Sequence, residues 1–197
     1  MAAAGRAIVA RGMAGLRVRD VAEEAGLSAG LVSYYYRDLD DLVLDVHQDA
    51  VDRFYWARSR ATEEVRDPRE RIVRLVEAGL PTDTDDPVCR VLYEIHVHAA
   101  RSRVHAALMT ALWDREVSLY VAALQHGRDV GVFRLQASAA DIAANAVALE
   151  DAYGLHIVGG NSSVPHERAR ELVLRFLETQ TGCPLTPDGT CATEATP

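Results

Sequence analysis

The sequence predicts an all-α protein with about nine helices. Apolar residues recur at helical spacing along most of the 197 residues, and the alternation typical of strands is almost absent. Apolar residues make up 49% of the chain and aromatic residues only 6%, because alanine, valine and leucine dominate. This composition is typical of a helical soluble protein. Breaks rich in glycine and proline divide the chain into separate helical segments.

Helical periodicity and capping signals predict where the helices lie. Three short helices occupy the first 37 residues. A longer helix begins near Asp38, because Asp38 and Asp41 place carboxylates beside the unpaired amides of its first turn. The remaining helical segments cover residues 69–80, 87–100, 104–126, 139–158 and 165–181.

Charge is distributed unevenly along the chain. The net charge is −8, which by itself argues against nucleic acid as a partner. Residues 1–37, however, hold five arginines against three acidic residues, whereas the other 160 residues hold 16 arginines against 26 acidic residues. A mildly basic end on an acidic remainder suits a protein that touches DNA with one end only.

Residues 18–36 contain a motif of two short helices around a glycine turn. The segment VRDVAEEA, residues 18–25, places its valines and alanines on one face. Gly26 can take the positive φ that ends a helix sharply, and Ser28 can cap the helix that follows. Such a pair can place its second helix in the major groove of DNA. The same junction occurs in proteins that never touch DNA, so the motif alone leaves both interpretations open.

This segment resembles the N-terminal signature of the TetR family of transcriptional regulators. The resemblance lies in VRDVAEEAGLSAGLVSYYY, followed by Leu42. The later segments agree with the family in layout. The resemblance implies a helix-turn-helix DNA-binding head at 1–37, a linker helix at 38–66 and an effector-binding and dimerisation body at 67–181. Residues 182–197 are poor in apolar residues and are predicted to be a disordered tail.

The resemblance also implies a function and the residues that carry it. Family members bind double-stranded DNA operators as homodimers, most of them repress, and a small-molecule effector bound in the body releases them. In the family, the helix after the glycine turn enters the major groove, and the front of the preceding helix meets phosphates. By position, the DNA contacts fall on Arg17, Arg19, Ser28, Ala29, Gly30, Ser33, Tyr34 and Tyr35.

Three departures from the family pattern weaken the expected contacts with phosphate. The first helix is short ahead of the motif, and Arg17 replaces the usual hydroxyl cap of the second helix. Leu39, Asp40 and Asp41 stand where a lysine often meets a phosphate. These departures keep a second interpretation open, a helical interaction protein that retains the fold but has lost DNA binding.

The body contains candidates for an effector pocket and for a dimer interface. Polar and aromatic groups on its helices are pocket candidates because a buried polar group needs a partner, although an aromatic stripe is more often core. These candidates are Trp56, Tyr93, His96, Trp113, Tyr120 and Tyr153. The last two long helices offer more apolar surface than a small bundle needs, and the family pairs them with a second copy. The corresponding residues are Leu149, Tyr153, Ile157, Leu172, Val173, Phe176 and Leu177.

Other classes of protein find little support in the sequence. It has no glycine-rich phosphate loop, nucleophile elbow or cluster with metal-ligand spacing, so we expect neither an enzyme nor a metal or cofactor. Cys183 and Cys191 are expected to be free thiols. No apolar run approaches the ~18 residues of a membrane span, which predicts a cytoplasmic protein without membrane contact.

Overall fold

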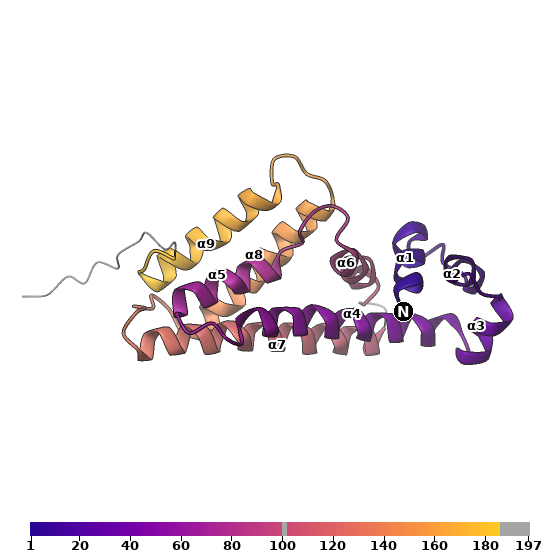
Figure 1. The fold of residues 1–197 in the computed structure, drawn as a ribbon, viewed down its shortest axis with the longest axis horizontal. Helices are drawn as coiled ribbons and strands as arrows, with labels where there is room; N and C mark the ends of the chain where they lie inside the picture. The colour runs from indigo at the N-terminus through magenta and orange to yellow at the C-terminus, as the bar shows by residue number, and fades with distance from the viewer. Residues whose placement is uncertain (100–101, 186–197) are drawn as a thin grey trace, which may run out of the picture. The chain divides into compact units, whose positions relative to one another are not determined.

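Nine helices follow one another in the part of the chain that the computed structural model describes, residues 1–99 and 102–185. They are α1 (Ala2–Arg11), α2 (Val18–Ala25), α3 (Ala29–Tyr35), α4 (Leu39–Thr62), α5 (Pro68–Gly79), α6 (Pro87–Ala99), α7 (Arg103–Asp129), α8 (Ala139–Val158) and α9 (His166–Thr181) (Figure 1). These residues contain no strand. The predicted all-α fold is confirmed.

Side-chain caps begin several of these helices where the sequence predicts them. The Asp41 amide donates to Asp38 Oδ1 at 2.9 Å ahead of α4. The Asp141 amide donates to Ser138 Oγ at 3.1 Å at the start of α8. Each contact satisfies an amide that the first helical turn leaves without a partner, so the helix boundaries follow from local chemistry.

The described chain packs as two compact units. Unit 1 comprises residues 1–55 and 85–112, and unit 2 comprises the described residues of 56–84 and 113–197. Helices α4 and α7 each contribute residues to both units. The first part of the predicted linker helix therefore packs in the same unit as the predicted head.

The core of unit 1 joins the three N-terminal helices to α4 and α6. Helix α1 contacts α2 and α6, and α2 contacts α3. Ile8 of α1, Val43 of α4 and Ile95 of α6 are almost completely buried in this core. Val32 of α3 is 6% exposed and anchors that helix to it. The short helices are thus held by apolar packing rather than by their own length, which is too small for independent stability.

The core of unit 2 is built by α5, α7, α8 and α9. Helix α8 packs on α9, and α5 contacts both. Cys183 and Leu185 are buried in the same core, so ordered chain continues beyond α9 to residue 185. The rest of the predicted tail, including Cys191, lies outside the described residues. Cys183 is disulfide-bonded, which corrects the expectation of a free thiol at this position.

No helix in the described ranges combines the length and the apolar character that a membrane span requires.

Candidate functional site

The turn between α2 and α3 has the geometry that the sequence predicts. Gly26 adopts a left-handed conformation with φ of 67° and ends α2, and the Leu27 amide donates to the carbonyl of Ala22 at 2.8 Å. Ser28 Oγ then accepts from the Leu31 amide at 3.2 Å and caps α3. These hydrogen bonds hold the end of α2 and the start of α3, so the turn between them fixes the direction of α3.

Helix α2 begins without a hydroxyl cap. Arg17 occupies the cap position, and its side chain makes no cap hydrogen bond. The Asp20 carboxylate reaches back instead and accepts from the Arg17 amide at 2.8 Å. The Arg17 side chain is therefore not used to hold the helix end, and it is exposed, as is that of Arg19.

Helix α3 presents nearly all of its side chains to solvent. Tyr34 is 81% exposed and Tyr35 72% exposed, and their rings meet edge to face with centroids 5.3 Å apart. Outside its own helix backbone, a Cβ added at Gly30 would meet no atom of the described chain within 4 Å. The remaining predicted contacts on this helix and its cap, Ser28, Ala29 and Ser33, are exposed as well. The structure thus gathers hydroxyls and small residues on one open helix, which suits hydrogen bonds to phosphates and base edges.

A charged cluster is buried in unit 2. Arg58 of α4 donates from Nη1 to Glu116 Oε1 of α7 at 2.5 Å and from Nη2 to Glu150 Oε2 of α8 at 2.8 Å. Its Nη2 also donates to the carbonyl of Leu75 in α5 at 3.3 Å. The Tyr120 hydroxyl donates to Glu150 Oε1 at 2.5 Å. The Arg58 guanidinium therefore links α4 to α5, α7 and α8, and it is hydrogen-bonded to two carboxylates.

Burial governs protonation in this cluster. It raises the pKa of Glu116 to about 8 and that of Glu150 to about 7, although Arg58 opposes both shifts. The cluster is almost completely buried and contains one guanidinium for two carboxylates. A negative charge on both carboxylates would therefore be neither fully balanced nor hydrated. We therefore expect the pair of carboxylates to retain a proton near neutral pH.

Stability should fall as pH rises through this range. A carboxyl whose pKa is higher in the folded state binds its proton more tightly there, so its stabilisation is complete at low pH and is lost as pH rises through the folded value. We expect the free energy of unfolding to fall by about 2 kcal/mol between pH 6 and 9, measured by urea denaturation. Glu116→Gln should flatten this dependence, whereas Glu63→Gln, at an exposed site, should not. Stability that rises over the same range would contradict the assignment.

A second buried polar group lies in unit 1. His47 of α4 is fully buried, with Nδ1 2.9 Å from His105 Nδ1 and Nε2 3.3 Å from the Met109 sulfur on α7. A thioether can only accept, so His47 donates from Nε2 and accepts at Nδ1 from His105. Burial lowers the pKa of His47 to about 4, which keeps it neutral. Across the described ranges, no three His, Cys, Asp or Glu side chains are arranged to hold a metal ion.

The predicted effector residues fall in both units. Tyr120 is fully buried in the charged cluster, whereas Trp113 is 36% exposed and Trp56 48% exposed. Tyr153 is half-buried on α8, and these four residues belong to unit 2. Tyr93 and His96 lie on α6 in unit 1, where Tyr93 is half-buried and His96 is exposed. Their role in binding an effector stays a prediction.

The predicted dimer residues on α8 and α9 differ in how much surface they keep. Val173 and Leu177 are fully buried in the core of unit 2, and Ile157 is 5% exposed. The residues that retain surface for a partner are Leu149, Tyr153, Leu172 and Phe176, all half-buried. Leu155, on the same helix as Tyr153, is 58% exposed and was not among the predicted contacts.

A helix-turn-helix with an exposed second helix is the arrangement that many DNA-binding transcriptional regulators place in the major groove. Residues 1–46 match bacterial regulatory proteins of the tetR family, and residues 68–182 match the C-terminal part of BetI-type transcriptional repressors. The chain belongs to the TetR family of transcriptional regulators, as the sequence predicts, and carries a BetI-type C-terminal body.

Several solved structures share this fold. A transcriptional regulator from Saccharomonospora viridis in complex with choline has a TM-score of 0.82 and 26% identity, over 89% of this chain and 92% of its own. A TetR transcription regulator from Haloarcula marismortui has a TM-score of 0.80 and 23% identity, over 90% and 94%. A TetR-family regulator from Rhodococcus has a TM-score of 0.78 and 23% identity, over 91% and 95%. No curated protein matches the sequence.

Proposed function

We propose that this protein binds an operator in double-stranded DNA as a homodimer through α3. The observation that supports the proposal is the exposure of α3, where two adjacent tyrosines extend into solvent although apolar packing usually covers such side chains. In this proposal Ser28, Ser33 and Tyr34 contact phosphates or base edges. Arg17 and Arg19 meet phosphates, and Ala29 and Gly30 allow close approach.

Removal of the Tyr34 side chain tests this proposal. Tyr34→Ala should weaken binding to the DNA upstream of the protein's own gene about tenfold, because it removes a hydroxyl and an aromatic contact. Fluorescence anisotropy at two salt concentrations measures the change. Thr110→Ala on α7 is the control, since its hydroxyl donates to the carbonyl of Ala106 in its own helix. Affinity that falls steeply with salt would support phosphate contacts. Absence of DNA binding at low salt would instead favour a helical interaction protein.

We further propose that the protein represses transcription and that a small molecule bound in unit 2 releases it from DNA. The relative from Saccharomonospora viridis was solved with choline, and its body corresponds in fold to this one. Trp56, Trp113 and Tyr153 supply partly exposed aromatic surface in unit 2, and aromatic faces attract organic cations. Choline is therefore the first effector to test. Unchanged DNA affinity with choline present would reject this effector and leave DNA binding intact.

The dimer would form through α8 and α9. Leu149, Tyr153, Leu172 and Phe176 keep apolar surface on these helices, and a two-fold pair would place two copies of α3 on the two halves of a palindrome. Sedimentation of the wild-type protein and of Phe176→Glu measures the assembly. A regulator of this kind works beside the chromosome, so we place it in the cytoplasm.

A further inference from the structure

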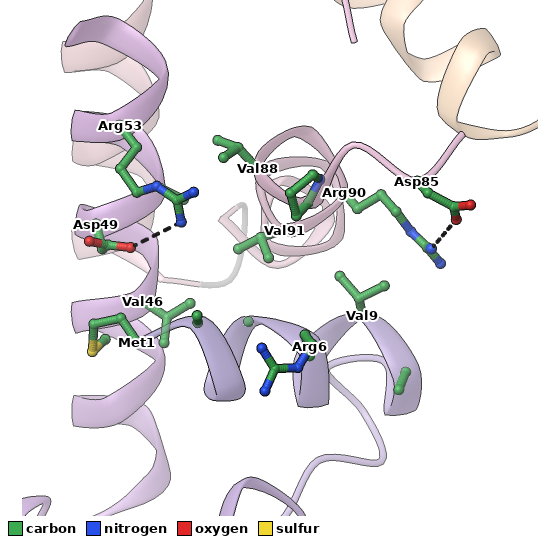
Figure 2. A pocket seen from close by; sticks show the side chains of 15 residues that line it. Met1, Arg6, Val9, Val46, Asp49, Arg53, Asp85, Val88, Arg90 and Val91 are labelled. Atoms are coloured by element: carbon green, nitrogen blue, oxygen red, sulfur yellow. Dashed lines mark hydrogen bonds and ion pairs between the residues drawn. The ribbon is translucent and has the colours of Figure 1, made fainter. Parts of the chain in front are cut away.

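A cavity of about 540 Å³ lies within unit 1, where α1, α4 and α6 meet. In Figure 2, α6 is seen end-on, α4 runs up the view and α1 runs across it. The helices therefore cross rather than lie along one another. The volume of the cavity falls in the range of small-molecule sites. It lies in the unit that contains the DNA-binding helices, and it includes none of the predicted effector residues.

The inner surface of this cavity is apolar. Val46 and Ala50 of α4 and Val91 of α6 are at most 5% exposed and line it, and the half-buried Val9 and Val88 complete it. Helices α1 and α6 approach closely at Gly5, where an added Cβ would lie 3.2 Å from Val91 Cγ2. An aliphatic chain could cover these apolar walls, because its transfer from water to an apolar surface lowers the free energy.

Arginines stand at the edge of the same cavity. Its lining includes Arg6, Arg53 and Arg90 against Asp49 and Asp85. Figure 2 shows Arg90 reaching toward Asp85, with which it pairs at 3.0 Å, whereas Arg53 extends from α4 and Arg6 lies on the α1 side. Arg53 is 3.7 Å from Asp49, and both side chains are well exposed. Arg6 pairs with Glu24 at 2.6 Å, again in solvent.

These ion pairs leave the arginines able to bind an anion. Solvent-exposed pairs contribute little free energy, so an incoming carboxylate can share or replace the acidic partner at small cost. A guanidinium holds a carboxylate with two parallel hydrogen bonds, which adds affinity and orientation. The Asp49 contact exceeds hydrogen-bond distance, so it does not use the donors of Arg53 in this way.

We propose that this cavity binds a small aliphatic carboxylate. Its head group lies against Arg53, and its chain lies against the valines of α1, α4 and α6. The site is separate from the effector site proposed in unit 2. A ligand held between α1 and α6 would touch α1, which packs on α2, the helix that contacts α3.

Calorimetric titration of the full-length protein with octanoate, without DNA, tests the site. Octanoate should bind, and acetate should bind at least about tenfold more weakly because it lacks the chain. Arg53→Gln should weaken octanoate about tenfold. Arg60→Gln, at an exposed site on the same helix, should leave octanoate affinity unchanged.

A second pair of variants tests the location. Val88→Trp places an indole in the cavity and should abolish octanoate binding, whereas Val97→Trp, at a site that is 74% exposed on the same helix, should not. Thermal unfolding of each variant reports whether it folds. Equal octanoate affinity in wild type and a folded Val88→Trp would overturn the proposal, as would no binding to wild type. Arg53→Gln keeps the test decisive if Val88→Trp does not fold. None of these measurements depends on an operator, so they fail independently of the proposed DNA binding.

Discussion

Replacement of Arg58 with methionine is expected to lower the free energy of unfolding by about 3–5 kcal/mol. The guanidinium is 1% exposed and supplies the only positive charge in the described part of the buried cluster. Its loss leaves Glu116 and Glu150 in the core of unit 2 without a counter-ion. Each must then stay charged without a partner or take up a proton, and both cost free energy. Urea denaturation followed by circular dichroism measures the change.

Two further variants separate the charge effect from a general loss of packing. Arg60→Met, two residues away and exposed, should change stability by less than about 0.5 kcal/mol. Glu116→Gln and Glu150→Gln introduced together with Arg58→Met should recover part of the loss, because the uncompensated charges are removed. A loss below about 1 kcal/mol for Arg58→Met alone would mean that the cluster does not stabilise unit 2 through its charges.

A carboxylate on α3 is expected to reduce DNA affinity about 100-fold without unfolding the protein. Gly30 is exposed on this helix, and a Cβ there would meet no atom of the described chain within 4 Å outside its own helix backbone, so we expect Gly30→Glu to fold normally. In the proposed complex its charge would lie among phosphates. Anisotropy titration at low salt measures the affinity, and the thermal unfolding midpoint reports the fold.

Matched variants identify the cause of any loss. Gly30→Ala adds bulk without charge and should retain most of the affinity, since Cβ has room. Ser162→Glu adds the same charge at an exposed position between α8 and α9 in unit 2, away from α3 in the sequence. It should change affinity little beyond a uniform electrostatic effect. If Gly30→Glu binds DNA as tightly as the wild type, α3 is not the helix that reads the groove.

The helices and their boundaries could be predicted because their causes are local. The caps at Asp38 and Ser138 and the left-handed turn at Gly26 depend on residues within one helical turn. The exposed face of α3 could also be predicted, since small and hydroxylated residues interrupt its apolar pattern. Family membership followed from the same segment, which is continuous in the sequence.

The charged cluster could not be predicted, because charged residues in an amphipathic helix normally face solvent. The pattern on α7 identified Tyr120 as a pocket candidate but did not indicate that its hydroxyl meets Glu150. The buried His47 was missed for a similar reason, since its partners His105 and Met109 lie on a helix far along the chain.

The sequence by itself determined the all-helical class, the order of the helices, the glycine turn and the family. Each depends on residues that are neighbours in the chain or one helical turn apart. Only the tertiary structure decided the partners of Arg58, which lie 58 and 92 residues away, and the cavity that α1, α4 and α6 enclose. These features depend on how separate helices pack, and the free energy of burying a charge or leaving a space is set by neighbours that no local pattern specifies.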